Sequence, residues 1–295
     1  FTMSKGLSII IPVYNEQGAI EATLEEINRI CEAAGFAFEI IVINDGSTDD
    51  TLEKLQAIKL PFKLFSHEKN RGYGAAIKTG FWETSFDTIA ITDADSTYPN
   101  KKLPEMYTLA GNYDMVVGAR SFGELPKRTR PAKWMIHKLA NYVVSFRIPD
   151  INSGLRVFKK QAFEPFIPII PEGFSLTTTI TLGMLSGGYK VHYIPIDYFV
   201  REGKSKIKPV RDTLNFMRLI FKIGLYFAPM KIFLPFSLFL FILGIAWGVF
   251  STLYLGKFAD ASTIIVLTTA IQIAFLAMIA ELINHRIPNF YFKKK

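Results

Sequence analysis

The chain has 295 residues, a formal net charge of +8 and a mean hydropathy of +0.23, which is high for a purely soluble protein. Its one cysteine, Cys31, excludes an internal disulfide framework and suits a reducing compartment. Residues 1–119 are net acidic, whereas residues 120–222 hold most of the basic excess. This basic region indicates attraction to anionic lipid headgroups, a phosphate-binding site, or both. Nucleic acid is not an expected partner, because no recognised nucleic-acid module accompanies the charge.

The N-terminal part alternates apolar runs with amphipathic segments. The run Leu7–Val13 predicts a strand buried on both faces, and the spacing of Ile20, Leu24 and Ile27 predicts a helix over 18–32. Further strands are predicted over 40–43, 62–65, 88–92 and 114–118, with intervening helices over 49–57 and 72–84. Asp49 or Thr48 is expected to cap the first of these helices. The alternation predicts an α/β fold with a mostly parallel, doubly wound sheet.

The middle of the chain is less regular. Helices are predicted over 132–146 and 174–186, and a strand over 190–199. Residues 209–227 then interleave basic and apolar residues, which predicts a helix in the membrane interface, with an ordinary packed helix as the alternative. The interfacial interpretation is favoured because two long apolar segments follow. We therefore expect a juxtamembrane amphipathic helix over 209–230, after an N-terminal domain over 1–208.

Two segments near the C-terminus are long enough to cross a membrane. Residues 232–256 and 261–280 contain no charged residue, and about 20 helical residues span the hydrocarbon core. They predict a transmembrane hairpin over 231–284, with helices at about 232–256 and 261–283; a pair of buried core helices is the alternative. Basic residues before 232 and in the tail, 285–295, predict that both flanks are cytoplasmic. No signal peptide is expected, because the apolar run at 7–13 is too short.

Three polar segments each follow a predicted strand: residues 14–16, 45–47 and 93–95. Because ligands gather at the carboxyl ends of parallel strands, these segments are expected to share one edge of the sheet. Asp93 and Asp95, one residue apart, can share a divalent cation such as Mg²⁺, which prefers oxygen ligands. An isolated Asp-x-Asp could equally cap the turn that follows it. The convergence of the three segments is the argument for a site.

Seven motifs occur in order along the chain. They are Ile10–Glu16, Asn44–Asp49, Asn70–Ala76, Asp93–Asp95, Val117–Arg120, Asn152–Arg156 and Arg201–Lys206. Together, over about residues 7–208, they resemble a family 2 glycosyltransferase with the Rossmann-like GT-A fold. The Ser-Gly-x-Arg and Gly-x-Ser-Lys motifs and the C-terminal hairpin are similar to the polyprenyl-phosphate glycosyltransferases. That group includes dolichyl-phosphate mannose synthase and bacterial undecaprenyl-phosphate glucosyltransferases.

The resemblance implies a nucleotide-sugar site. Its expected donor-binding residues are Pro12, Tyr14, Glu16, Asp45, Arg71, Gly72, Lys78, Asp93 and Ala94. The first four would hold the nucleoside of a UDP- or GDP-linked sugar, although Asn44-Asp45-Gly46 would also make a turn in any protein. Arg71 and Lys78 would contact the phosphates or be solvated. Asp93 and Asp95 would bind Mg²⁺ or Mn²⁺ at the donor diphosphate. Thr97 stands where dolichyl-phosphate relatives often carry Gln, which leaves the third metal ligand open.

The resemblance also implies an acceptor-phosphate site in the basic region. Its expected residues are Arg120, Arg130, Lys133, His137, Arg201, Ser205 and Lys206. Arg120 and Arg201 match family motifs directly. Lys133 and His137 stand where relatives carry Arg and Ser, and Arg130 could replace the displaced arginine. Arginine suits this task because its planar guanidinium binds phosphate with two hydrogen bonds. Each of these residues could instead be solvated or face lipid.

The expected reaction is an inverting, metal-dependent transfer of a sugar to a polyprenyl phosphate, undecaprenyl or dolichyl, at the cytoplasmic membrane face. Asp93, Asp95 and Arg120 are the expected catalytic residues. Residues 174–179 contain no carboxylate, with Glu172 nearby, and an ionised phosphate acceptor needs no strong base.

Two alternatives stay open. One is a membrane glycosyltransferase with a hydroxyl acceptor, such as a polysaccharide or glycolipid synthase; the other is a catalytically inactive, membrane-anchored nucleotide-binding protein. The sequence leaves the oligomeric state open, although a two-helix anchor could associate with copies of itself.

Overall fold

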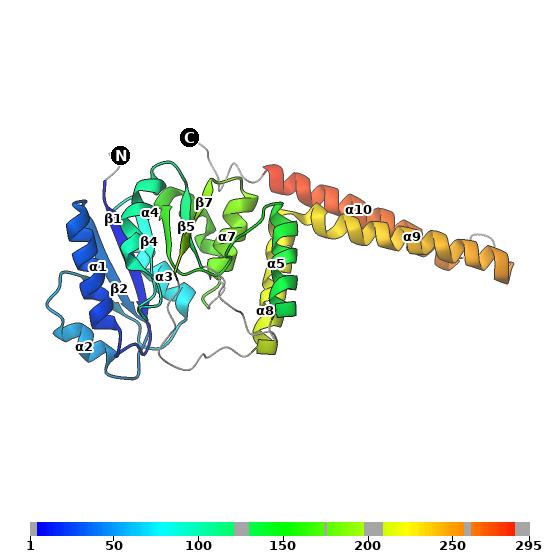
Figure 1. Cartoon of the computed structure of the whole chain (residues 1–295). Helices are drawn as coiled ribbons and strands as arrows, with labels where there is room; N and C mark the ends of the chain where they lie inside the picture. Colours follow the sequence, from blue (N-terminus) through cyan, green and yellow to red (C-terminus); the bar gives the residue numbers. More distant parts are fainter. Residues whose placement is uncertain (1–4, 121–129, 174–175, 198–208, 257–260, 287–295) are drawn as a thin grey trace.

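The computed structural model describes residues 5–120, 130–173, 176–197, 209–256 and 261–286, and they form an α/β domain from which a long helical hairpin projects (Figure 1). The domain is built on a seven-stranded sheet with the order β3-β2-β1-β4-β6-β5-β7. The strands are β1 (Leu7–Val13), β2 (Phe38–Asn44), β3 (Lys63–Ser66), β4 (Thr88–Ile91), β5 (Met115–Arg120), β6 (Arg156–Lys159) and β7 (Val191–Ile196). The predicted α/β fold with a mostly parallel, GT-A-like sheet is confirmed.

One strand runs against the others. β1 pairs in parallel with β2 and β4, β2 with β3, and β5 with β7. β6, which the sequence analysis did not predict, is antiparallel to both β4 and β5 and opposes Ile91 with Arg156. Because an antiparallel strand begins where its parallel neighbours end, the segment that leads into β6 arrives at the carboxyl edge of the sheet. This direction brings residues 150–155 to the predicted site.

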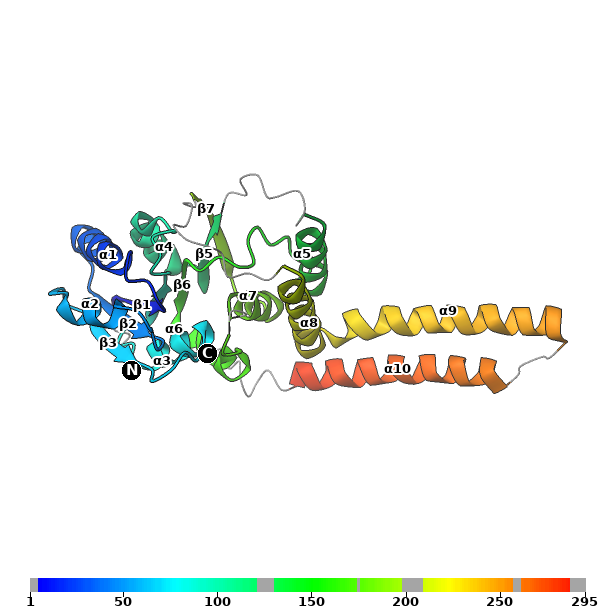
Figure 2. The same cartoon turned by 90° about the horizontal axis from the view of Figure 1, so that it is seen from below.

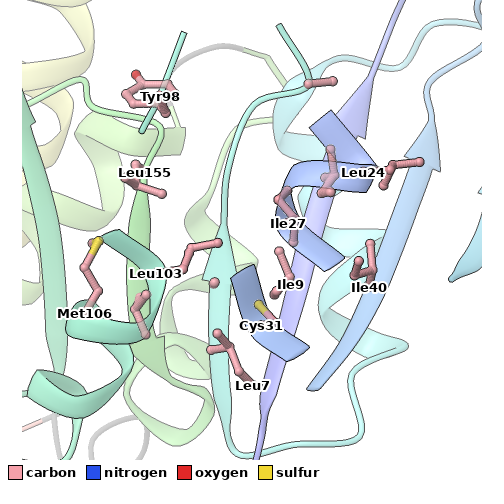
Figure 3. Packing of buried hydrophobic residues seen from close by; sticks show 14 of the residues in the cluster. Leu7, Ile9, Leu24, Ile27, Cys31, Ile40, Tyr98, Leu103, Met106 and Leu155 are labelled. Carbon is pink, nitrogen blue, oxygen red and sulfur yellow. The ribbon is translucent and has the colours of Figure 1, made fainter. Parts of the chain in front are cut away.

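Helices cover both faces of the sheet, as expected for strands buried on both sides. On one face lie α1 (Ile20–Ala34), α2 (Thr51–Ala57) and α4 (Leu103–Ala110); on the other lie α3 (Tyr73–Trp82), α6 (Lys160–Phe163) and α7 (Leu176–Ser186). Alternate residues of β1 serve the two layers: Ile9 packs with α1, whereas Ile10 packs with α3. Figure 3 shows the first layer, in which Leu24, Ile27 and Cys31 lie over β1 and β2. Burial raises the pKa of the Cys31 thiol to about 12, so this cysteine is a packing residue.

The predicted boundaries are close to the observed ones, with a few corrections. The second helix begins at Thr51, two residues after Asp49, whose carboxylate accepts the Thr51 backbone N–H at 3.1 Å, as one of the two expected capping residues. Asp50 is the N-terminal flanking residue, and its side chain makes no capping hydrogen bond. Short 3₁₀ segments at Asn100–Lys102 and Glu164–Ile169, together with α4 and α6, were not predicted.

A third apolar cluster joins α5 (Arg130–Val144) to α7 and α8 (Pro209–Phe227) at the end of the sheet nearest the hairpin (Figure 2). Val143 of α5 packs there with Ile220 and Ile223 of α8. On α8, Phe221 and Tyr226 point away from this contact and are about half exposed. One side of α8 is therefore packed, while another presents aromatic side chains outward; its position in a membrane interface stays a prediction.

The hairpin consists of α9 (Pro229–Leu255) and α10 (Ala261–Arg286), which lie side by side in both views (Figures 1 and 2). Both helices are long and apolar enough to cross a membrane. α9 begins three residues before the predicted 232 and ends one residue before the predicted 256, whereas α10 begins as predicted and ends three residues after the predicted 283. Gly244 and Gly248 of α9 face α10, where an added Cβ would meet Leu267 at 2.8 Å and Thr263 at 2.9 Å. These glycines allow the two helices to approach closely.

Candidate active site

The three predicted polar segments meet at one sheet edge, because β1, β2 and β4 are parallel and each segment follows the carboxyl end of its strand. Asn15, in a left-handed conformation with φ of 56°, bridges the first two segments. Its backbone N–H donates to Ser47 Oγ at 3.1 Å, and its Oδ1 accepts the Thr48 backbone N–H at 2.8 Å. The Glu16 backbone N–H donates to Thr51 Oγ1 at 3.0 Å. The loops after β1 and β2 therefore form one connected structure.

Asp95 is held in place by Thr97. The Thr97 hydroxyl donates to Asp95 Oδ1 at 2.6 Å, and the Thr97 backbone N–H donates to the same oxygen at 3.2 Å. Thr97 is fully buried, whereas both aspartates are half-buried. Thr97, which stands where a Gln ligand was considered, therefore orients Asp95. Ala94, an expected donor contact, has a buried side chain, and its carbonyl accepts from Thr23 Oγ1 at 3.1 Å.

Asp93 lies against the segment that enters β6. A Cβ added to Gly154 would lie 2.7 Å from Asp93 Oδ2, so any larger residue here would have to displace this carboxylate. The Gly154 backbone N–H donates to the buried Tyr98 hydroxyl at 2.7 Å, which fixes the segment. Burial, followed by the negative charge of Asp93, raises the pKa of Tyr73 well above its ordinary value. Tyr73 therefore stays neutral beside the carboxylate.

The carboxylates of Asp93 and Asp95 suit a hard divalent cation whose remaining ligands come from a substrate. Within the described part of the chain, no group of three or more His, Cys, Asp or Glu side chains could hold a metal ion. The protein thus offers two carboxylates, Asp93 and Asp95, of which the second is oriented by a buried hydroxyl. Mg²⁺ is commonly bound by one or two carboxylates together with substrate phosphates and water. The residues fit Mg²⁺ or Mn²⁺ on these grounds.

Asp45 organises the loop before α3. Its Oδ1 accepts the Arg71 backbone N–H at 2.9 Å, and its Oδ2 accepts the Gly72 backbone N–H at 2.7 Å. His67 contacts Asp45 Oδ1 through Nδ1 at 2.7 Å and Thr79 Oγ1 through Nε2 at 2.9 Å. Asp45 is almost fully buried. The structure thus gives this carboxylate a positioning role, besides the nucleoside contact expected from the sequence.

Gly72 and Gly74, at the start of α3, leave room for the backbone of residues 171–173. An added Cβ would lie 2.6 Å from the Glu172 carbonyl oxygen at Gly72 and would collide with the Pro171 carbonyl at Gly74. Gly72 has a φ of +100°, which side chains rarely adopt. The segment around Glu172 therefore crosses the N-terminus of α3, where the same carbonyl accepts the Ala75 N–H at 3.0 Å.

The remaining expected donor residues are distributed along the same edge. Pro12, within β1, and Tyr14 are half-buried; Arg71 is exposed before α3, and Lys78 is half-buried in that helix. No cation among them is drawn into a described ion pair. Their roles at the nucleotide stay predictions.

Arg120, at the end of β5, is bound to Asp150. Nε donates to Asp150 Oδ2 at 2.6 Å, Nη2 donates to Oδ1 at 3.0 Å, and the Arg120 backbone N–H reaches Oδ2 at 3.2 Å. Burial raises the pKa of Asp150, but the hydrogen bonds and charge of Arg120 outweigh this effect and hold it below its ordinary value. A guanidinium has five N–H donors, so an ion pair along one side orients it without using all of them.

Arg156 is fully buried beneath this site. It donates to the carbonyls of Ser153 at 2.7 Å and Ile151 at 3.1 Å, and to Thr181 Oγ1 at 2.7 Å. A buried guanidinium that binds two loop carbonyls fixes the backbone between them. Burial raises the pKa of Tyr193 to about 12, although the nearby positive charge of Arg156 acts to lower it. The Ser-Gly-x-Arg motif therefore positions the loop next to Asp93.

The acceptor residues expected from the sequence are only partly described. Arg130, Lys133 and His137 lie in the N-terminal half of α5; the side chains of the first two are outside the described part, and His137 is half-buried. Arg201, Ser205 and Lys206 fall outside the described residues altogether. The described structure thus contains the Arg120 end of this predicted site.

Sequence reasoning missed Asp150, Tyr98 and the positioning roles of Thr97 and Arg156. A signal for Asp150 exists: it is the one acidic residue between 125 and 163, inside a strongly basic stretch. A lone carboxylate in such surroundings is a candidate partner for a buried cation. Tyr98 gives no comparable signal, because its hydroxyl finds Gly154 only through the pairing of β4 with β6.

Comparison with known proteins extends these observations. Residues 228–285 match a family model described as the GtrB C-terminal hairpin. The dolichol-phosphate mannosyltransferase of Pyrococcus furiosus is 29% identical over 74% of this chain and 63% of its own length. A dolichyl-phosphate hexose transferase of Haloferax volcanii is 27% identical over 74% of this chain and 94% of its length. An undecaprenyl-phosphate 4-deoxy-4-formamido-L-arabinose transferase of Pseudomonas syringae is 29% identical over 72% and 64%. The chain spans less than two thirds of the Pyrococcus and Pseudomonas relatives.

The fold is similar to that of solved glycosyltransferases. Glucosyl-3-phosphoglycerate synthase from Mycobacterium tuberculosis, in complex with phosphoglyceric acid, superposes with a TM-score of 0.57, covering 75% of this chain and 79% of that one at 19% identity. The same enzyme with Mn²⁺, UDP and glucosyl-3-phosphoglycerate gives a TM-score of 0.57 at 18% identity, with the same coverage. Residues 8–166, more than half of the chain, match the model described as glycosyl transferase family 2. The chain therefore belongs to glycosyl transferase family 2.

Proposed function

We propose that this protein transfers a sugar from a nucleotide sugar to a polyprenyl phosphate, with inversion at the anomeric carbon and with a divalent cation. The single observation that carries the proposal is the meeting of Asp93, Asp95 and Arg120 at one sheet edge, in a chain with a long apolar hairpin. Relatives named as polyprenyl-phosphate transferases, at 27–29% identity, support the lipid acceptor. Solved structures of similar fold that contain UDP and Mn²⁺ support the nucleotide and the metal.

The donor side would use residues that the fold already orders. Asp93 and Asp95 would hold Mg²⁺ or Mn²⁺, which, when bound, neutralises charge on the leaving diphosphate. Thr97 keeps Asp95 oriented, and the Gly154 segment keeps Asp93 in position. Asp45 fixes the loop at Arg71 and Gly72, which forms one wall of the proposed nucleotide site. Such preorganisation lowers the cost of binding the transition state.

The acceptor side would need a cation more than a base. Arg120, oriented by Asp150, would hold the acceptor phosphate. An oxygen of that phosphate attacks the anomeric carbon, its bond to carbon forms as the bond to the diphosphate breaks, and the nucleoside diphosphate leaves from the opposite face. Asp150 is a poor general base, because its pKa is lowered by Arg120. An acceptor phosphate that is already ionised needs no such base.

The membrane location follows from the same chemistry. α9 and α10 would anchor the protein as a two-span hairpin, and the basic residues on its flanks would keep the catalytic domain on the cytoplasmic side. A polyprenyl phosphate presents its charged end at this surface. The hairpin would therefore keep the enzyme next to its lipid substrate.

The test mixes the purified full chain with a panel of UDP- and GDP-linked sugars, polyprenyl phosphate, and Mg²⁺ or Mn²⁺. We expect one donor to yield a glycosyl phospholipid, with loss of product on chelation. Product on a lipid hydroxyl, or on a growing polysaccharide, would replace the acceptor assignment. Failure to form a glycosylated lipid from any donor, with either metal, would overturn the proposal.

A further inference from the structure

The cytoplasmic domain and the hairpin are joined by a set of polar contacts between α5 and α9. Lys231, the third residue of α9, donates through Nζ to the Val143 carbonyl at 2.7 Å and to Ser145 Oγ at 2.8 Å. In the reverse direction, the Tyr142 hydroxyl donates to the Lys231 carbonyl at 2.8 Å. We call these four residues the α5–α9 clamp. It links segments that are more than 80 residues apart in the sequence.

The clamp lies where charge and helix geometry favour it. Val143 is in the last turn of α5, whose carbonyls have no intrahelical partner, and Ser145 just beyond has a left-handed φ of 53°. A lysine ammonium at a helix C-terminus satisfies such carbonyls and interacts favourably with the helix dipole. Here the lysine comes from another helix, so the same contact that stabilises α5 also fixes α9 to it.

Apolar packing holds the same junction from the side of α8. A Cβ added to Gly224 of α8 would lie 2.6 Å from Ile232 and 3.2 Å from Val143. The three helices therefore meet at near-backbone contact around this glycine. α10 joins them through Glu281, whose Oε2 accepts the Met230 backbone N–H at 3.3 Å. A carboxylate at the start of α9 complements the dipole of that helix.

The clamp lies at one end of the helix that begins with the expected acceptor residues. α5 starts at Arg130, and Lys133 and His137 follow in its first half, whereas Val143 lies ten residues beyond Lys133. At 1.5 Å per residue, that separation is about 15 Å along the helix. Because α5 is one uninterrupted helix, fixing its C-terminal end to α9 sets the position of its N-terminal half relative to the hairpin. A hairpin in a bilayer is in turn fixed relative to the lipid surface.

We propose that Lys231 is a positioning residue for the lipid acceptor: through the α5–α9 clamp it sets the acceptor side of the site at the height of a membrane-bound phosphate. The inference rests on the proposed function. A positioning role predicts different effects on two kinds of acceptor, whereas a purely structural role predicts the same effect on both. An acceptor confined to the bilayer requires this alignment, whereas a short, water-soluble prenyl phosphate diffuses to the site wherever the site lies.

The experiment compares two acceptors with the full chain in lipid vesicles and one nucleotide sugar. One acceptor is a long-chain polyprenyl phosphate in the bilayer; the other is a short, water-soluble prenyl phosphate. Lys231→Met should lower kcat/KM for the bilayer acceptor about 10-fold or more, since displacements of about 1 Å can have such effects. For the soluble acceptor the change should stay within about 2-fold. Lys231→Arg, which keeps a cationic donor, should restore most of the bilayer activity.

A matched control removes an equivalent contact elsewhere. Lys160 at the start of α6 also donates its ammonium to a backbone carbonyl, that of Thr84, at 2.9 Å. Lys160→Met should leave the ratio of the two activities unchanged. An equal loss with both acceptors in Lys231→Met, or no loss with either, would overturn the inference while leaving the proposed function intact. A wild-type protein inactive with both acceptors would instead overturn the proposed function, and the inference with it.

Discussion

The guanidinium of Arg120 and the carboxylate of Asp150 form a two-point ion pair at the edge of the sheet, with contacts of 2.6 and 3.0 Å. Asp150 is 2% exposed and Arg120 is 25% exposed, so the carboxylate forms the buried side of the pair and the guanidinium the more accessible one. This arrangement turns a flexible arginine into an oriented cation. It also explains why the one acidic residue of a basic stretch lies at this position.

Replacing Asp150 should therefore affect both stability and catalysis. In Asp150→Asn, one strong acceptor is lost and Arg120 is no longer fixed, so we expect the free energy of unfolding to fall by about 1–3 kcal/mol. The rate of transfer should fall by about 10-fold or more, because the acceptor phosphate meets a misoriented cation. Chemical denaturation and initial rates measure the two effects. An Asp150→Asn enzyme with wild-type turnover would contradict the role given to this pair.

The lowered pKa of Asp150 also predicts how stability depends on pH. A carboxyl group with a lower pKa in the folded state than in the unfolded state stabilises the fold above the unfolded value, here 3.8. This contribution is lost as the pH falls through the lower, folded value. The difference in unfolding free energy between wild type and Asp150→Asn should therefore be constant near neutrality and shrink below about pH 4. A difference that grows on acidification would show that the sign is wrong.

Thr97 should control metal affinity through Asp95. Thr97→Val keeps the shape of this buried side chain but removes the hydroxyl donated to Asp95 Oδ1. Groups that orient a metal ligand commonly contribute about 10- to 100-fold in affinity, so the concentration of Mn²⁺ that gives half-maximal activity should rise by such a factor. Thr108→Val, which removes an exposed hydroxyl bonded within α4, is the matched control and should leave this concentration unchanged. Equal metal requirements in the two variants would refute the proposed role.

Gly154 offers a test of Asp93 that leaves the fold largely intact. In Gly154→Ala the new methyl group would lie 2.7 Å from the end of the Asp93 side chain, which can swing aside at modest cost. We expect little change in thermal stability but at least about a 10-fold loss of activity at low metal concentration. Gly173→Ala, where an added Cβ meets nothing within 4 Å, serves as the control. A fully active Gly154→Ala protein would contradict the role proposed for Asp93 in metal binding.

The sequence predicted those features that are local. The buried strand over 7–13 has the predicted boundaries, and the helix predicted over 209–230 begins as predicted but ends at Phe227, because hydrophobic periodicity and apolar runs report such elements directly. The polar segments after three strands were placed on one edge because the direction of parallel strands follows from the alternation of elements. Asp93 and Asp95 were placed at this edge for the same reason, and their role in metal binding stays a prediction.

Features that depend on pairing across the chain could not be predicted. β6 has four residues, and its antiparallel direction is set by β4 and β5 rather than by its own sequence. The contact between Arg120 and Asp150 follows from that direction, as does the approach of Gly154 to Asp93. Likewise, the sequence shows Lys231 only as a charged residue next to an apolar segment. Its binding to the end of α5 depends on how three helices pack around Gly224.

The most direct test of the account is the formation of a glycosyl polyprenyl phosphate by the full chain, detected by mass, with Asp95→Ala and Thr108→Val assayed in parallel. We expect wild type and Thr108→Val to form the product with Mg²⁺ or Mn²⁺. Asp95→Ala should be slower by about 100- to 1,000-fold, because several kcal/mol of charge stabilisation are removed. Full activity in Asp95→Ala, or no product from wild type with any nucleotide sugar, would contradict the account.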